Sequence, residues 1–185
     1  MIALDPRTTA LVLIDLQNGI LGRKLAPVTA EELVARGKAL AEKFRAARAF
    51  VVLVRAVPKL DGPEQQVDEP SALPRVLPAG FADLAPGLAD PSDILITKST
   101  WGAFFCTDLD SELRRRGVST IVLGGVATHI GVESTARQAW ELGYELVIAR
   151  DLTTSMGPEP HEASMRHIFP RIARITDTDA LALRD

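Results

Sequence analysis

The 185-residue sequence contains very little cysteine, because Cys106 is the only one. A single cysteine cannot form an internal disulfide, and it cannot build a zinc site that needs several cysteines. This composition is typical of proteins in a reducing compartment. With 46% apolar residues, the chain can bury a sizeable core and does not need disulfides or a bound metal to stabilise it.

The sequence also has no excess of positive charge. Lys and Arg number 21 and Asp and Glu number 24, which gives a formal net charge of −3. This balance gives no electrostatic reason to expect nucleic acid or an anionic membrane as a partner. The apolar run Ala10–Ile14 near the start is far too short for a signal sequence or a membrane span. We therefore expect a cytoplasmic protein with a single domain over residues 1–185.

What the sequence does have is an alternation of short apolar runs and amphipathic stretches. Runs that are apolar at consecutive positions are typical of strands covered on both faces. Helical patterns lie between them, at residues 29–48, 108–116, 129–142 and 159–169. This alternation predicts right-handed βαβ units and a mostly parallel sheet. The apolar runs are Ala10–Ile14, Phe50–Val54, Ile94–Ile96, Thr120–Leu123, Glu145–Ala149 and a weaker Ala173–Thr176.

Two of the predicted helices begin with the spacing of a capping box. Thr29 is followed by Glu32, and Thr107 is followed by Asp110. Gly117 and Gly143 stand where helices commonly end.

Residues 56–92 are different, because they hold seven of the twelve prolines and show little periodicity. A stretch of that length inside a compact domain is usually functional, and we interpret it as a lid or a pocket wall. The alternative is a disordered excursion.

Polar residues follow three of the predicted strands. Asp15 follows the first, Lys98 the third, and a glycine-rich turn at residues 124–131 follows the fourth and leads into a helix. Because ligands bind at the carboxyl ends of strands in open α/β sheets, these residues are expected to converge. Taken singly, Asp15 could only cap a turn, and Lys98 could be a surface lysine with its ammonium group in solvent. The turn lacks the glycine and lysine spacing of both common phosphate-binding motifs, so it does not indicate a nucleotide site.

Three segments resemble the isochorismatase-like hydrolases, also called cysteine hydrolases. They are Leu13–Asn18, Lys98–Thr107 and Gly125–Val132, each at the end of a predicted strand. The resemblance implies an α/β fold, a three-layer doubly wound sheet of about six mostly parallel strands with helices on both faces. Amidase members of this family use an Asp–Lys–Cys triad. Asp15 and Lys98 match the first two, but Gly131 stands at the position of the nucleophilic cysteine, so no thioester can form there.

The resemblance also covers members without that cysteine, including true isochorismatases. These hydrolyse a vinyl ether, which needs a proton delivered to carbon and then attack by water. In that scheme Asp15 is the general acid, and Lys98 orients it and stabilises negative charge. The family further implies a cis peptide between Val126 and Ala127, which would offer the Ala127 N–H to an anion. It implies a homo-oligomer as well.

We expect no cofactor and no metal. The nicotinamidase branch of the family has an aspartate and two histidines after the second strand, where this sequence has none of its three histidines. Cys106 lies outside the catalytic positions, and we interpret it as a buried free thiol. His161 and His167 are interpreted as structural.

Seven residues are candidates for lining a substrate pocket, and six of them have a structural alternative. Gln17 and Asn18 could serve only a turn, Arg55 a surface ion pair, Trp101 and Phe104 the core, and His129 the helix surface. The candidates are Gln17, Asn18, Arg55, Trp101, Phe104, Thr128 and His129.

Two further functions stay open. One is a different lyase or hydrolase in which Asp15 activates water, and the other is an altered amidase that binds a ligand or serves in assembly.

Overall fold

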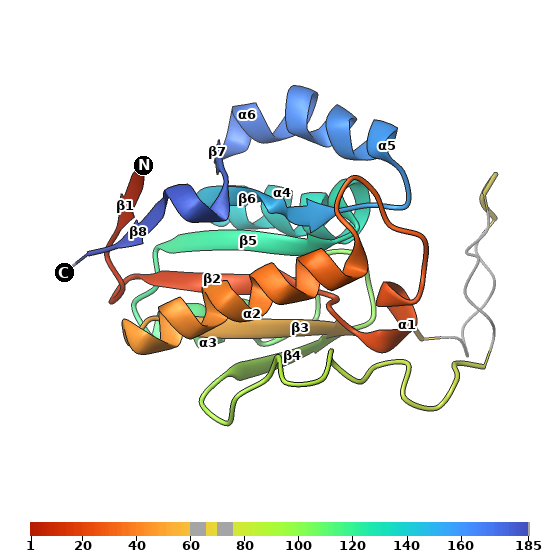
Figure 1. Ribbon diagram of the computed structural model, residues 1–185, viewed down its shortest axis with the longest axis horizontal. Coiled ribbons are helices and arrows are strands. Elements are labelled where there is room, and N and C mark those ends of the chain that lie inside the picture. Colours follow the sequence, from red (N-terminus) through yellow and green to blue (C-terminus); the bar gives the residue numbers. More distant parts are fainter. Residues whose placement is uncertain (60–65, 70–75, 185) are drawn as a thin grey trace.

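The computed structural model describes residues 1–59, 66–69 and 76–184, and its main feature is one six-stranded parallel sheet (Figure 1). The spatial order is β4-β3-β2-β5-β6-β7. Five strands cover the apolar runs that predicted them, and β7 covers all but the first residue of the sixth run, which confirms the expected fold class. The strands are β2 (Thr9–Ile14), β3 (Phe50–Ala56), β4 (Ile94–Lys98), β5 (Thr120–Val126), β6 (Glu145–Thr154) and β7 (Arg174–Thr176).

The direction of the winding reverses between β2 and β5. The chain runs outward from β2 through β3 to β4, returns to β5 beside β2, and runs outward again through β6 to β7. Such a switch point is where α/β sheets bind ligands, at the carboxyl ends of the strands. The two central strands are close there, since a Cβ on Gly125 would lie 2.1 Å from the Ile14 carbonyl oxygen. Asp15 follows β2 at this point.

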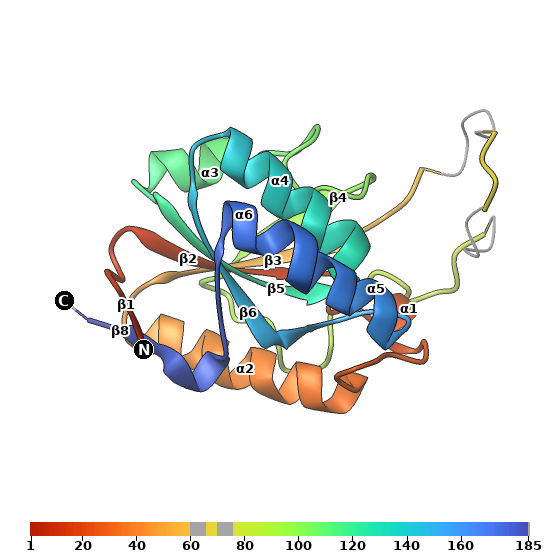
Figure 2. The same ribbon diagram turned by 90° about the horizontal axis from the view of Figure 1, so that it is seen from above.

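Helices cover both faces of the sheet (Figure 2). The long helix α2 lies on one face, and α3, α4 and α6 lie on the other. The predicted helix at 129–142 divides into a π-helical turn, η1 (Thr128–Val132), and α4. The predicted helix at 159–169 likewise divides into α5, a second π-helical turn (Ser164–Ile168) and α6. The helices are α1 (Asn18–Leu21), α2 (Ala30–Ala46), α3 (Leu109–Arg115), α4 (Glu133–Glu141), α5 (Pro158–Ala163) and α6 (Phe169–Ile172), with a 3-10 turn at Thr178–Ala180.

The sheet separates two hydrophobic cores. Leu11 and Leu13 of β2 face α2, whereas Val12 and Ile14 face the other layer. Burial on both faces explains why the strands are apolar at consecutive positions instead of alternating ones.

One of the two predicted capping boxes forms. The Thr29 hydroxyl accepts the Glu32 N–H at 3.3 Å, and the Glu32 carboxylate accepts the Thr29 N–H at 3.1 Å. The second prediction is wrong, because α3 has Asp108 as its N-cap, without a side-chain cap bond in the described structure. The Thr107 hydroxyl donates to the Ala103 carbonyl at 2.5 Å and accepts the Leu109 N–H at 3.3 Å, so it joins the preceding turn to the start of α3.

The chain termini form a pairing that the sequence did not indicate. β1 (Ile2–Leu4) and β8 (Leu181–Leu183) run parallel as a separate two-stranded sheet, with the two ends of the chain side by side (Figure 1). Strands of three residues are too short to show a period, so the sequence pattern does not reveal them.

The proline-rich segment contacts the chain just after Asp15. The Ala85 N–H donates to the Leu16 carbonyl at 2.9 Å, and the Gly19 N–H donates to the Phe81 carbonyl at 3.0 Å. The predicted lid or wall over 56–92 falls partly on 60–65 and 70–75, which lie outside the described residues. No helix in the described ranges is both long and apolar enough to cross a membrane.

Candidate active site

Asp15 occupies a sharp turn at the end of β2. Its backbone is left-handed, with φ of 58°, a conformation that aspartate tolerates better than most residues. Its N–H donates to the Val54 carbonyl at 2.8 Å, and its carbonyl accepts the Gln17 N–H at 2.8 Å. These bonds fix the carboxyl group at the carboxyl edge of the sheet.

Asp15 and Lys98 form a buried ion pair. The Lys98 Nζ lies 2.8 Å from the Asp15 Oδ2, and the two side chains are only 3% (Lys98) and 8% (Asp15) exposed. Lys98 comes from the end of β4, so the pair spans the end of the intervening β3. Nζ also donates to the carbonyls of Thr100, at 3.2 Å, and Trp101, at 3.0 Å. All three protons of the ammonium group therefore have acceptors.

The second oxygen of Asp15 is free. Oδ1 is buried and has no hydrogen-bond partner among the described residues. Burial raises the pKa of Asp15 from 3.8 to about 6, and the Lys98 charge and hydrogen bond oppose this rise without cancelling it. With a pKa of about 6, roughly one carboxyl group in ten carries its proton at pH 7. An unpartnered, partly protonated carboxyl oxygen can donate a proton to a bound molecule.

Gly131, in η1, faces this carboxyl group. A Cβ there would lie 3.4 Å from the Asp15 Oδ2, 3.3 Å from the Val126 carbonyl oxygen and 3.2 Å from the Ile14 Cγ2. The structure thus brings Asp15, Lys98 and Gly131 together at one edge of the sheet, and the interpretation of residue 131 as the nucleophile position stays a prediction. The peptide between Val126 and Ala127 is cis, as the resemblance implied.

The Gln17 side chain hydrogen-bonds to two distant segments of the chain beside the site. Its side chain donates to the carbonyls of Ala56, at 3.0 Å, and Phe81, at 3.1 Å, and accepts the Ala56 N–H at 2.6 Å. A fully buried amide with these partners holds β3 and the 76–92 segment to the Asp15 turn. Asn18 lies more exposed at the start of α1, with its Nδ2 3.5 Å from the Gly80 carbonyl oxygen.

The three candidates from β3 and the loop after Lys98 differ from one another in their contacts and exposure. Arg55 donates from Nε to the Thr97 hydroxyl at 3.0 Å. Phe104 packs against the second core, with its ring 5.8 Å from that of Tyr144. Trp101 is 66% exposed, although its carbonyl accepts a Lys98 hydrogen bond.

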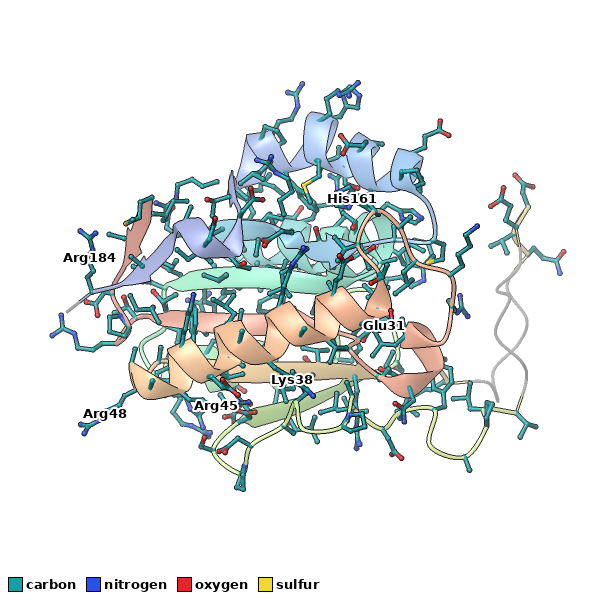
Figure 3. All side chains as sticks on the ribbon, in the orientation of Figure 1. Glu31, Lys38, Arg45, Arg48, His161 and Arg184 are labelled. Carbon is teal, nitrogen blue, oxygen red and sulfur yellow. The ribbon has the colours of Figure 1, made fainter. Side chains whose placement is uncertain are left out.

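The two polar residues after the cis peptide both contact C-terminal segments. The Thr128 hydroxyl lies 2.9 Å from Nδ1 of His161, a buried residue of α5 (Figure 3), and the His129 Nδ1 lies 2.7 Å from the Ser155 hydroxyl. Burial lowers the pKa of both histidines. Sequence reasoning missed Ser155, although it directly follows β6, and the rule applied to the other strand ends would have found it.

The interpretation of Cys106 as a buried thiol is wrong, because the residue is exposed. It lies in a left-handed turn, with φ of 53°, before α3. Its neighbours Ala103 and Leu109 fill the adjacent core.

A search of the described ranges finds no group of three or more His, Cys, Asp or Glu side chains that could hold a metal ion. The expectation of a site without metal or cofactor remains a prediction.

The Isochorismatase domain family matches residues 9–180 of this chain. The chain is 50% identical over 185 residues to the uncharacterized isochorismatase family protein YecD of Escherichia coli O157:H7, covering 98% of both. It is 33% identical over 211 residues to the ureidoacrylate amidohydrolase RutB of Methylobacterium radiotolerans, covering 97% of this chain and 80% of that protein.

Solved structures show the same similarity. An isochorismatase family protein from Burkholderia thailandensis superposes with a TM-score of 0.90 at 39% identity, covering 97% of this chain and 95% of that one. N-carbamoylsarcosine amidase from Thermoplasma acidophilum shares the fold, with a TM-score of 0.75 at 24% identity over 93% of this chain and 97% of that one. Because the family model matches most of the chain and a relative is 50% identical over nearly its whole length, the chain belongs to the isochorismatase-like hydrolase family.

Proposed function

We propose that this protein hydrolyses a small molecule without a covalent intermediate, with Asp15 as general acid and Lys98 as its partner. The observation that carries the proposal is the buried Asp15–Lys98 pair. Its Oδ2 binds Lys98 and would lie 3.4 Å from a Cβ on Gly131, and its Oδ1 is buried without a hydrogen-bond partner among the described residues. Glycine has no side chain to attack a carbonyl group, so water must be the nucleophile.

A vinyl ether, isochorismate or a related compound, suits this arrangement. The protonated Asp15 gives its proton to the methylene carbon, which leaves a positive charge on the ether carbon. Water adds to that carbon and returns one proton to the Asp15 carboxylate. Loss of the alcohol from this adduct yields a ketone, which is pyruvate in the case of isochorismate. The Asp15 carboxylate formed in the first step is stabilised by the Lys98 ammonium group 2.8 Å away. A pKa of about 6 suits a general acid working near neutral pH.

A second candidate function is an altered amidase homologue that binds a ligand or serves in assembly. The similarity to an amidohydrolase favours it. A Cβ on Gly131 would lie 3.2 to 3.4 Å from its nearest neighbours, so those atoms would have to move by a few tenths of an ångström to accept a side chain. A third hypothesis keeps the same site but makes Asp15 the base that activates water on another substrate.

The first test is turnover of isochorismate by the purified protein, with pyruvate measured by mass spectrometry. We expect release by the wild type and none by Asp15→Asn. The matched control is Asp93→Asn, which breaks another ion pair, at 2.6 Å to Arg45, at the opposite end of β4. That variant should lose stability but keep turnover.

Absence of release from the wild type would contradict isochorismate as the substrate. Gly131→Cys should then be assayed on small amides. Activity appearing in that variant would support the altered amidase, because only the nucleophile would have been missing.

A further inference from the structure

We propose that Thr135 is a positioning residue, which holds the loop after Lys98 against η1 and so keeps the Lys98 ammonium group beside Asp15. Its catalytic consequence rests on the function proposed above. The contacts that support it lie in α4, one turn beyond Gly131.

The Thr135 hydroxyl joins two elements of the site. It donates to the Gly131 carbonyl at 2.7 Å and accepts the Ala103 N–H at 3.1 Å, and the residue is 1% exposed. The first bond, to the residue four positions back, is common for threonine in helices. The second crosses from α4 to the loop that carries Trp101, and helix geometry alone does not require it.

Gln138, one turn further along α4, makes a second contact with the same loop. Its Oε1 accepts the Phe104 N–H at 3.2 Å. Gly102 makes room for it, because a Cβ there would lie 2.2 Å from that oxygen. Thr135 and Gln138 therefore bind two consecutive N–H groups of the loop.

The same loop supplies two of the three acceptors of Lys98. Thr100 and Trp101 accept from Nζ through their carbonyls, and the third proton goes to Asp15. Ala103, held by Thr135, is only two residues beyond Trp101. A shift of this backbone would move both carbonyls and, with them, the ammonium group.

The direct readout is the titration of Asp15, followed by carbon-13 NMR of its carboxyl group in the full-length protein. Thr135→Val keeps the size of the side chain but loses both hydrogen bonds. Lys98 opposes the rise of the Asp15 pKa, so a looser Lys98 should let that pKa rise by about half a unit or more. Thr135→Ser keeps the hydroxyl and should restore the wild-type value.

Thr154→Val is the matched control. The Thr154 hydroxyl is equally buried, donates to the Val28 carbonyl at 2.7 Å and accepts the Val28 N–H at 3.2 Å, away from the Lys98 loop. It should lower the melting temperature as Thr135→Val does, with the Asp15 titration unchanged. Gln138→Leu, at a half-buried position, serves if Thr135→Val does not fold, and should shift the pKa in the same direction by less.

An unchanged or lower Asp15 pKa in Thr135→Val and Gln138→Leu would overturn the proposal. So would an equal shift in Thr154→Val or a failure of Thr135→Ser to restore the value. Because the titration needs no substrate, it tests the positioning role even if isochorismate is not turned over. On a substrate that is turned over, kcat of Thr135→Val should fall roughly tenfold with little change in KM.

Discussion

At the scale of single residues, the raised pKa of Asp15 predicts how the stability of the protein depends on pH. Its folded pKa of about 6 lies above the ordinary 3.8, so the folded protein binds this proton more tightly than the unfolded chain does. The stability contributed by the proton is fully present below pH 3.8 and is lost as the pH rises through 6.

If Asp15 is the general acid, kcat/KM should fall above pH 6, by about tenfold per pH unit in the limit. The measurement is the pH–rate profile of the purified protein on the substrate identified by turnover. A rate that rises with pH through 6 would contradict the acid role and indicate that Asp15 acts as a base.

Replacing both members of the ion pair should be far less harmful than replacing one. Asp15→Asn alone leaves the Lys98 charge buried and should cost about 3–5 kcal/mol of unfolding free energy. Asp15→Asn with Lys98→Met removes both charges, and asparagine tolerates the left-handed backbone at this position. Urea denaturation at about pH 7 should therefore show the double variant close to the wild type. Lys98→Met alone completes the comparison. If the double variant lost as much unfolding free energy as the two single variants together, Asp15 and Lys98 would not be energetically coupled.

At the scale of elements, the site depends on how closely β5 approaches β2. Gly125 has φ of 128°, and a Cβ on it would lie 2.1 Å from the Ile14 carbonyl oxygen, beside Asp15. Backbone cannot yield as a flexible side chain can, so this position excludes larger residues.

Gly125→Ala should cost more than about 4 kcal/mol and prevent accumulation of folded protein. Gly143→Ala is the control, because Gly143 also has positive φ, at 85°, but a Cβ on it would meet no described atom within 4 Å. It should cost only about 1 kcal/mol. Circular dichroism and denaturant titration of both variants distinguish the steric clash at residue 125 from the cost of a positive φ alone. Equal losses of unfolding free energy would show that the close approach of β5 to β2 does not exclude a larger residue.

At the scale of the whole molecule, the two hydrophobic cores share one sheet. Each central strand contributes alternate side chains to both, so neither core can lose its packing while the strands stay intact. This predicts a single cooperative unfolding transition.

Phe44→Ala and Phe169→Ala test this from opposite faces, since both side chains are fully buried, one in each core. Each should cost about 3–5 kcal/mol and move the same transition. Calorimetry and circular dichroism should agree on one midpoint per variant, and two separate transitions would show that the layers unfold independently. A homo-oligomer, a cytoplasmic location and a small-molecule partner remain predictions at this scale.

The sequence by itself determined the layers of the fold and the core of the site. Six apolar runs predicted six strands, because strands buried on both faces need apolar residues at consecutive positions. Asp15, Lys98 and Gly131 could be placed together, because parallel strands bring their carboxyl ends to one edge. The Thr29 capping box could be predicted as well, because its bonds join residues three positions apart.

Only the tertiary structure decided which polar side chains face the site and which hydrogen-bond the segments around it. Gln17 binds Ala56 and Phe81, and Thr135 binds Ala103, all far away in the sequence. Thr107 looked like the first residue of a capping box, but Asp108 is the N-cap of α3. Cys106 looked like a core thiol but lies on the surface. A local pattern describes a residue and its near neighbours along the chain, whereas hydrogen bonds and burial depend on partners that folding brings from elsewhere.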